Sequence, residues 1–328
     1  MVRITRWRHE GVERGGFVHD GAVFALPGRD PVNDLLEAGL SATLRIADNT
    51  LGAAAGHHLA DVDLLPPLQP RSIRDFVTFE EHVEGIVRRM SDQAVVVDEW
   101  YQAPTFYFTN PHTVRATDEQ IGIPAGCQEL DYEAEVGIVI GRMPGSSGTN
   151  LDYDDAQAHI FGLTVLNDWS ARDLQLREMR VGLGPCKGKD FATTLGPWIV
   201  TADEFAPRFT DDGFLPLAMR VRVNGHEYGS DLLSNMGWPL SDLVRYASAD
   251  SRVVPGDVLG TGTCGRGCLA ELWGRKGDLT PPPLVPGDVV EVEVEGIGTI
   301  RNSIGPRREA LTLVPARHRD RTRPRAQR

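Results

Sequence analysis

The sequence has few cysteines, no long apolar run and no excess of positive charge. Its four cysteines among 328 residues are too few and too irregularly spaced for a disulfide framework or a zinc site. No run of 18 apolar residues occurs, and the N-terminal segment lacks the apolar core of a signal peptide. The formal net charge of −12 gives nucleic-acid binding little electrostatic support. We therefore expect a cytoplasmic protein that binds neither nucleic acid nor membrane.

A phosphate-binding loop is also missing. The glycine-rich stretch 182–196 surrounds Lys187 and Lys189, but it does not match the pattern of a nucleotide-binding loop. We therefore predict no organic cofactor. A lysine held in a glycine-rich turn can still supply a fixed positive charge to an oxyanion.

Amino-acid composition and the positions of glycine and proline divide the chain into three predicted parts. Hydrophobic residues make up 41% and charged residues 24%, which is ordinary for a globular protein. Short alternating segments separated by glycines predict a small β-rich domain over residues 1–65, with a short helix beginning at Pro31. Residues 66–315 would form the main domain. Residues 316–328 carry six arginines without an apolar pattern, which predicts a disordered tail.

Two acidic residues interrupt a buried-strand pattern over residues 129–140, ELDYEAEVGIVI. Glu133 and Glu135 are two apart, so on a strand they project to the same face. Two buried like charges need a partner, and a divalent cation takes carboxylate oxygens well. An edge strand with one solvated face explains the pattern equally well.

A helix is predicted after Thr78, which with Glu81 fits a capping box. His82 lies on the flank of the apolar stripe of this helix, where partial shielding can shift the pKa of an imidazole. A histidine that only packs at the helix edge is an equal alternative.

A third informative stretch is the apolar strand predicted over residues 160–166. Asp168 follows its end, and Arg172 and Gln175 share one face of the next predicted helix. This arrangement suits a binding site, and it suits a structural salt bridge equally well. The aromatic residues between Trp100 and Phe108 predict either core or the wall of a pocket for an organic substrate.

Together these stretches resemble the fumarylacetoacetate hydrolase family from about Ile73 to Ile304. The resemblance is carried, in family order, by Asp75, His82, the acids of DYEAEV, and the segments NDWSARDLQ, GKDFATT, SNMGW, GTG and LAEL. It implies an α+β, mostly β fold, a mixed strand-rich β-roll that is usually dimeric. It also implies a divalent metal, Mg²⁺ or Ca²⁺ and in some cases Mn²⁺, and a small 2-oxo or 1,3-dicarbonyl acid as substrate.

The resemblance assigns roles to individual residues. The implied metal ligands are Asp75, Glu133, Glu135 and Asp168. The implied catalytic residues are His82 with Glu271, and Arg172, Gln175 and Lys189, which would orient the substrate and stabilise an oxyanion. Tyr107 and Thr263 match substrate-contacting positions, and Thr193 matches a position near a second cation.

The reaction type depends on the partner of His82. In the short decarboxylase-like members a glutamate follows the histidine by three positions, where this chain has Gly85. Glu271 instead matches the glutamate that pairs with histidine in the carbon–carbon hydrolases, which favours hydrolysis over isomerisation or decarboxylation. The chain departs from those hydrolases at Val77, where they have a tyrosine. The arginine for the distal carboxylate is displaced, which leaves Arg88 or Arg89 as candidates.

Overall fold

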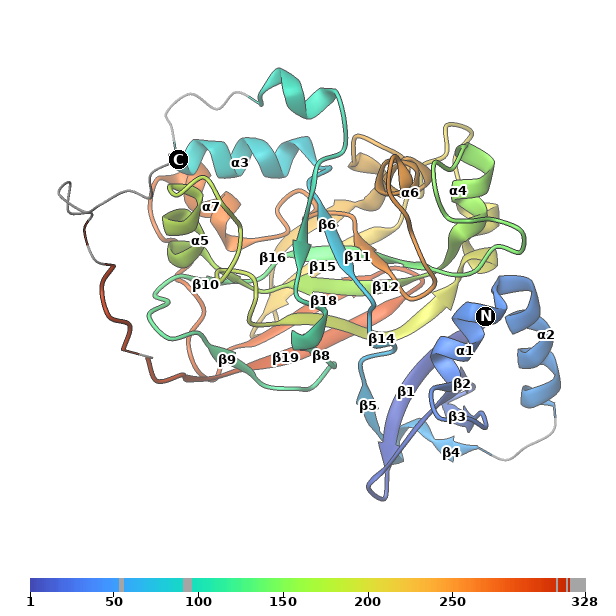
Figure 1. Cartoon of the computed structure of the whole chain (residues 1–328). Helices are drawn as coiled ribbons and strands as arrows, with labels where there is room; N and C mark the ends of the chain where they lie inside the picture. Colours follow the sequence, from blue (N-terminus) through green and yellow to red (C-terminus); the bar gives the residue numbers. More distant parts are fainter. Residues whose placement is uncertain (53–55, 91–95, 311, 317, 319–328) are drawn as a thin grey trace, which may run out of the picture.

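The computed structural model describes residues 1–52, 56–90, 96–310, 312–316 and 318. A large mixed sheet and a smaller sheet pack against each other with the main hydrophobic core between them (Figure 1). Short helices cover the ends and edges of the sheets. This confirms the expected α+β, strand-rich fold.

Twelve strands of the described residues form the large sheet. Its order is β4 (His57–His58), β3 (Ala22–Ala25), β2 (Val12–His19), β1 (Arg3–His9), β14 (Thr193–Thr201), β12 (Ile160–Asp168), β11 (Ala134–Ile140), β17 (Val258–Gly260), β6 (Ile73–Phe76) and β7 (Phe106–Thr109). β5 (Asp63–Leu65) pairs with β1, and β8 (Val114–Arg115) pairs with β14. The sheet is mixed because β17 and β6 run parallel while β11 and β12 run antiparallel.

The smaller sheet has the order β16 (His226–Leu232), β15 (Ala218–Val223), β18 (Val289–Val294), β19 (Gly298–Arg307) and β9 (Ile121–Ile123). Alternation explains its buried face: Val290, Val292 and Val294 are buried, whereas Glu291 and Glu293 between them are half-exposed. A separate short ladder joins β10 (Leu130–Asp131) to β13 (Ser170–Ala171).

The helices gather in three places. Figure 1 shows α3 (Glu80–Met90), α5 (Arg172–Met179) and α7 (Leu269–Lys276) together at one end of the molecule. α4 (Tyr153–His159) packs with α6 (Leu240–Ser248), and α1 (Pro31–Ala38) packs with α2 (Leu40–Leu51). Short 3-10 helices span Leu59–Asp61, Asp98–Tyr101, Pro111–Thr113, Ala202–Arg208 and Leu233–Asn235. Every helix of the described residues is too short or too polar to cross a membrane.

The N-terminal segment extends the large sheet through the pairing of β1 with β14. Ile4 and Phe17 also share a core with Phe161 and Ile199 of the neighbouring strands. The predicted helix from Pro31 is present, but α2 was not predicted, because Thr and Asn weaken its helical pattern and no side chain caps it at Gly39. The domain boundary at residue 65 stays a prediction. Most of the predicted tail, residues 317 and 319–328, lies outside the described residues.

Candidate active site

Glu135 lies on β11, an interior strand of the large sheet, and Glu133 immediately precedes this strand. β11 is hydrogen-bonded to β12 on one side and to β17 on the other. Glu133 and Glu135 are only 5% and 1% exposed. The edge-strand alternative is therefore wrong, and both carboxylates need buried partners.

Two further carboxylates join this pair from neighbouring strands. Asp75 comes from β6, and Asp168 ends β12, so strand order brings together acids that lie far apart in sequence. Gly260 of β17 leaves room between them. A Cβ at this position would lie 2.6 Å from Asp75 Oδ1 and 2.8 Å from Glu135 Oε2.

Burial and mutual repulsion shift the titration of these acids. Burial and the charge of Asp168 raise the pKa of Asp75 well above its ordinary value, and burial and Asp75 do the same to Glu135. Burial also raises the pKa of Asp168, although Lys189 opposes this. Burial would raise the pKa of Glu133 too, but the charges of Lys189 and Arg172 outweigh it and lower that pKa to about 2. If all four acids were ionised, the cluster would carry four negative charges against the two positive charges of Lys189 and Arg172.

Donor type and position both fit a divalent cation. Asp75, Glu133 and Asp168 each offer an oxygen, and these oxygens lie within 4.8 Å of one another. Within the described part of the chain, the buried oxygens Asp75 Oδ1 and Asp168 Oδ1 have no hydrogen-bond partner. Glu135 lies beside them and accepts hydrogen bonds from the Gly262 N–H at 3.1 Å and the Thr263 hydroxyl at 3.4 Å. Carboxylate oxygens are the ligands that hard cations prefer.

Two cations hold the acids in place. Lys189 pairs with Glu133, and its Nζ lies 2.6 Å from Asp168 Oδ2. Arg172 contacts Glu133 Oε1 at 2.7 Å. The Arg172 guanidinium also donates a hydrogen bond to Gln175 Oε1 at 3.2 Å. Burial would lower the pKa of Lys189, but Asp168 and Glu133 raise it above its ordinary value, so the amine stays charged.

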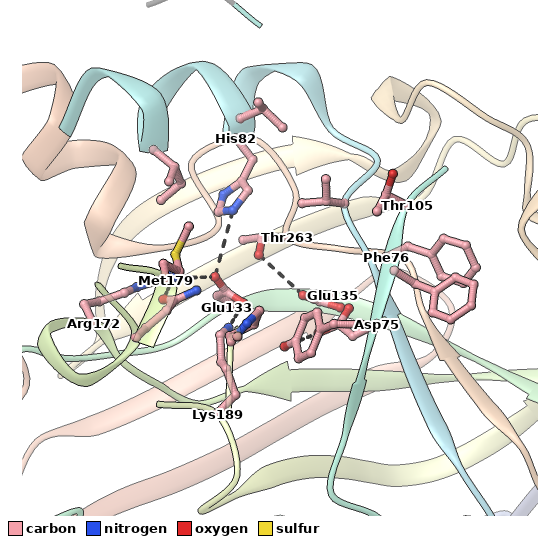
Figure 2. Close-up of a pocket in the computed structure, with 18 of the residues that line it drawn as sticks. Asp75, Phe76, His82, Thr105, Glu133, Glu135, Arg172, Met179, Lys189 and Thr263 are labelled. Atoms are coloured by element: carbon pink, nitrogen blue, oxygen red, sulfur yellow. Dashed lines mark hydrogen bonds and ion pairs between the residues drawn. The ribbon is translucent and has the colours of Figure 1, made fainter. Parts of the chain in front are cut away.

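His82 faces this cluster from above. Figure 2 shows the imidazole reaching from α3 toward Glu133, with Lys189 on the opposite side of the carboxylates. His82 Nδ1 lies 2.9 Å from Glu271 Oε1 on α7, and Nε2 lies 3.9 Å from Glu133 Oε1. The Arg266 N–H donates to Glu271 Oε2 at 2.8 Å. A proton on Nδ1 that is donated to Glu271 leaves Nε2 able to accept a proton.

Gly85 allows this contact, because it is where α3 meets α7. A Cβ on Gly85 would lie 2.8 Å from Glu271 Cγ, and a Cβ on Gly274 would lie 2.1 Å from the Gly85 carbonyl oxygen. A glutamate at position 85 would therefore clash with Glu271 in its present position. The lack of a side chain at Gly85 is the local reason why Glu271 reaches His82.

Replacing Gly85 with alanine is expected to displace Glu271 and lower kcat. Overpacking of this kind costs about 1–3 kcal/mol of the free energy of unfolding. Urea unfolding and steady-state kinetics measure the two effects. Gly52→Ala is the control, because its new Cβ would meet its nearest neighbour at an ordinary 3.4 Å. An unchanged kcat in Gly85→Ala would show that turnover does not depend on the contact between His82 and Glu271.

Asp131 belongs to the site, although the sequence interpretation gave this acid of the DYEAEV segment no role of its own. Its buried carboxylate accepts hydrogen bonds from Arg172 Nε at 2.8 Å and from the N–H groups of Leu269 at 2.8 Å and Ala270 at 3.0 Å. It therefore connects the Arg172 guanidinium to the first turn of α7, the helix that carries Glu271. The signal was present: Asp131, Glu133 and Glu135 follow one another at intervals of two.

Asp131→Asn is expected to weaken both connections. Removing one partner of a buried ion pair costs about 3–5 kcal/mol of the free energy of unfolding. We expect kcat/KM to fall with stability, because Arg172 and α7 lose their common anchor. Asp118→Asn is the matched control: Asp118 is an exposed aspartate 3.7 Å from Arg301, and such a pair contributes about 0–1 kcal/mol. Equal stability of the two variants in denaturant titration would contradict the anchoring role.

Six of the predicted catalytic and substrate residues line one cavity of about 400 Å³, whereas Glu271 lies behind His82. Its lining includes His82, Arg172, Gln175, Lys189, Tyr107 and Thr263. The Tyr107 hydroxyl donates to Asp75 Oδ2 at 3.0 Å and also contacts Asp168. Thr193 is buried and lies opposite Asp168 in the β12–β14 ladder, outside the cavity lining. The structure therefore brings these residues together, and their roles stay predictions.

The two arginine candidates for a distal carboxylate do not line the cavity. Arg89 pairs with Glu129, and its guanidinium lies 4.9 Å from the centre of the Trp273 ring. Arg88 is exposed. The sequence alone did not indicate that α3 turns its valines and isoleucine, rather than these arginines, toward the cavity.

The site combines a buried carboxylate cluster on a mixed sheet with Arg172, Lys189 and a His–Glu pair from two helices, which is a donor set that suits a divalent cation. Residues 72–305 match the family model described as fumarylacetoacetate (FAA) hydrolase, C-terminal. The chain belongs to the fumarylacetoacetate hydrolase family.

Curated relatives of this family carry different activities. A fumarylacetoacetase of Oryza sativa subsp. japonica is 31% identical over 270 residues, which cover 68% of this chain and 62% of the rice protein. The human mitochondrial oxaloacetate tautomerase FAHD2A is 31% identical over 312 residues, which cover 90% of this chain and 87% of that protein. This chain thus spans less than two thirds of the rice enzyme, and family membership alone does not choose the reaction.

Solved structures share the fold. The maleylpyruvate hydrolase of Sphingobium sp. SYK-6, in complex with manganese(II) and pyruvate, superposes with a TM-score of 0.69 at 20% identity and covers 93% of this chain and 100% of its own. The fumarylacetoacetate hydrolase of Exiguobacterium antarcticum gives a TM-score of 0.67 at 24% identity, covering 94% of this chain and 100% of its own.

Proposed function

We propose that the protein is a divalent-metal-dependent hydrolase that cleaves a carbon–carbon bond in a 1,3-dicarbonyl acid of the acylpyruvate type. The observation that supports this most is the 2.9 Å contact between His82 Nδ1 and Glu271 Oε1, beside the carboxylate cluster. A base held in one tautomer by a carboxylate is suited to activating water. Keto–enol isomerisation needs a proton carrier but no activated water.

In this proposal the divalent ion would be held by four carboxylates, those of Asp75, Glu133, Glu135 and Asp168. The ion would act as a Lewis acid toward the carbonyl oxygens of the substrate. Mg²⁺, Ca²⁺ and Mn²⁺ all accept oxygen ligands, so each is a candidate. No organic cofactor is required. A homodimer is part of the proposal on family grounds.

The remaining steps belong to side chains of the cavity. His82 takes a proton from water at Nε2, and Glu271 stabilises the positive charge that develops on the ring. The hydroxide attacks the acyl carbonyl carbon, while Arg172, Lys189 and Gln175 stabilise the negative charge on its oxygen. When the carbon–carbon bond breaks, its electron pair stays with the 2-oxo acid fragment. The new carbanion takes the proton back from His82, which yields one carboxylic acid and one 2-oxo acid.

A second candidate is a metal-dependent tautomerase, isomerase or decarboxylase of a related 2-oxo acid. Similarity to the human oxaloacetate tautomerase favours this candidate, because the alignment of the two proteins covers 90% of this chain. Such reactions use the same cation and an enolate but no attack by water. A third candidate, an inactive ligand-binding homologue, is disfavoured because His82 and Lys189 line one cavity and Glu271 contacts His82 from behind the cavity lining.

Product analysis separates these functions. The metal-loaded protein is incubated with acylpyruvates and with oxaloacetate, and products are followed by chromatography. Equal amounts of a carboxylic acid and a 2-oxo acid support the hydrolase. Keto–enol equilibration or release of carbon dioxide without acyl cleavage would replace it with the second candidate. No conversion despite stoichiometric cation binding would support the third.

A further inference from the structure

Part of the cavity wall is apolar. Val83, Ile86 and Val87 of α3 line it on one side, and Val77, Phe106 and Met179 complete it. All six are at least partly exposed to solvent, and Ile86 and Phe106 also pack against the main core, so each offers apolar atoms to the cavity. In Figure 2, Met179 lies between α3 and Arg172, away from Asp75 and Glu135.

The positive charge of the cavity lining lies beside the carboxylates. Among the described residues that line the cavity, Arg172 and Lys189 are the only arginine or lysine side chains. Both already pair with acids of the site: Arg172 with Asp131 and Glu133, Lys189 with Glu133 and Asp168. A second carboxylate at the far end of a substrate would therefore lose hydration against this wall without gaining an ionic partner, which is unfavourable.

The apolar character continues at the rim. Met179 and Pro185 both line the cavity, and between them Val181 and Leu183 are 74% and 70% exposed. An apolar substituent that extends to this rim would remove these side chains from water, which is favourable in proportion to the area covered. A charged substituent would gain nothing from them.

We propose that the substrate carries an uncharged alkyl or aryl group on its acyl carbon, and that it lacks a second carboxylate. This inference rests on the proposed function, because it takes the 2-oxo acid head to lie at the carboxylate cluster. The head would be fixed at the cation site with Arg172 and Gln175. The alkyl or aryl group would lie against Val83, Val87 and Phe106.

Binding tests this without turnover. N-alkyl oxamates share the 2-oxo acid head but have no cleavable carbon–carbon bond. We would titrate the Mg²⁺-loaded protein by calorimetry with two oxamates of equal chain length, one ending in methyl and one in carboxylate. The methyl-ended ligand is expected to bind at least about tenfold more tightly, with about a fourfold gain for each added methylene. Acylpyruvates with the same two ends should show the same order in kcat/KM.

Two variants locate the effect. Val87→Arg places a cation on the apolar wall and should shift the preference toward the carboxylate-ended oxamate, with thermal unfolding used to verify that the variant folds. Arg88→Ala, an exposed position outside the cavity lining, should leave the preference unchanged. Tighter binding of the carboxylate-ended oxamate to the wild type, lost in Arg88→Ala or Arg89→Ala, would overturn the inference. If the methyl-ended oxamate binds more tightly but no acylpyruvate is cleaved, the proposed hydrolase reaction is contradicted and the inferred ligand preference stands.

Discussion

Replacing His82 with alanine is expected to lower kcat by about 10²–10⁴-fold, the usual contribution of a positioned general base. Nε2 of the His82 imidazole faces the carboxylates, while Nδ1 lies 2.9 Å from Glu271 Oε1. Cation affinity should change little, because His82 is not among the proposed ligands. Steady-state kinetics and calorimetric titration with Mg²⁺ measure the two quantities separately.

Glu271→Gln tests the same pair from the other side. Glutamine keeps the shape of the side chain but cannot stabilise a positively charged imidazole as a carboxylate does, so kcat should fall while the fold is kept. His112→Ala removes an exposed histidine outside the cavity lining and serves as the control. Normal turnover in His82→Ala would refute the proposed mechanism.

Removing the divalent cation is expected to abolish turnover and to lower the melting temperature. The buried acids of the site repel one another, and a bound cation relieves that repulsion in the folded state alone. A ligand at 100 times its Kd stabilises a protein by about 2.7 kcal/mol, so several degrees of Tm should return when Mg²⁺, Ca²⁺ or Mn²⁺ is restored. Differential scanning calorimetry after chelation measures the shift.

Substitutions assign this effect to the cluster. Glu135→Gln should weaken cation binding and reduce the Tm gain, because it removes a charged oxygen ligand. Glu227→Gln changes an exposed glutamate and should leave both unchanged. A cation-induced rise in Tm that is the same in all three proteins would place the ion elsewhere, and no rise in the wild type would argue against a resident cation.

The local pattern was sufficient for the acidic pair and insufficient for its surroundings. Period two placed Glu133 and Glu135 on one face, and the apolar run around them indicated burial. Only pairing decides between an interior and an edge strand, and the pairing partners of β11 lie at β12 and β17. Asp75 and Glu271 came from the family resemblance, because His82 and Glu271 are 189 positions apart and no local spacing connects them.

Tertiary contacts also overrode one predicted cap. Helix α3 begins as expected, but the Thr78 hydroxyl donates to the Thr261 carbonyl at 2.5 Å, and Glu81 pairs with Arg275 on α7 at 2.8 Å. Both side chains tie α3 to segments of the site rather than closing a capping box. The role of Asp131 was not predicted for a related reason: its partners on α5 and α7 become neighbours only in the folded chain.

The identity of the attacking nucleophile is the central claim, and isotope-labelled water tests it most directly. The Mg²⁺-loaded wild type is incubated with an acylpyruvate in ¹⁸O-enriched water, and the acid released from the acyl side is analysed by mass spectrometry. Hydrolysis assisted by His82 predicts one labelled oxygen in the new carboxylate and loss of this product in His82→Ala. Substrate that is consumed without labelled acid, or labelled acid formed equally by His82→Ala, would contradict the account.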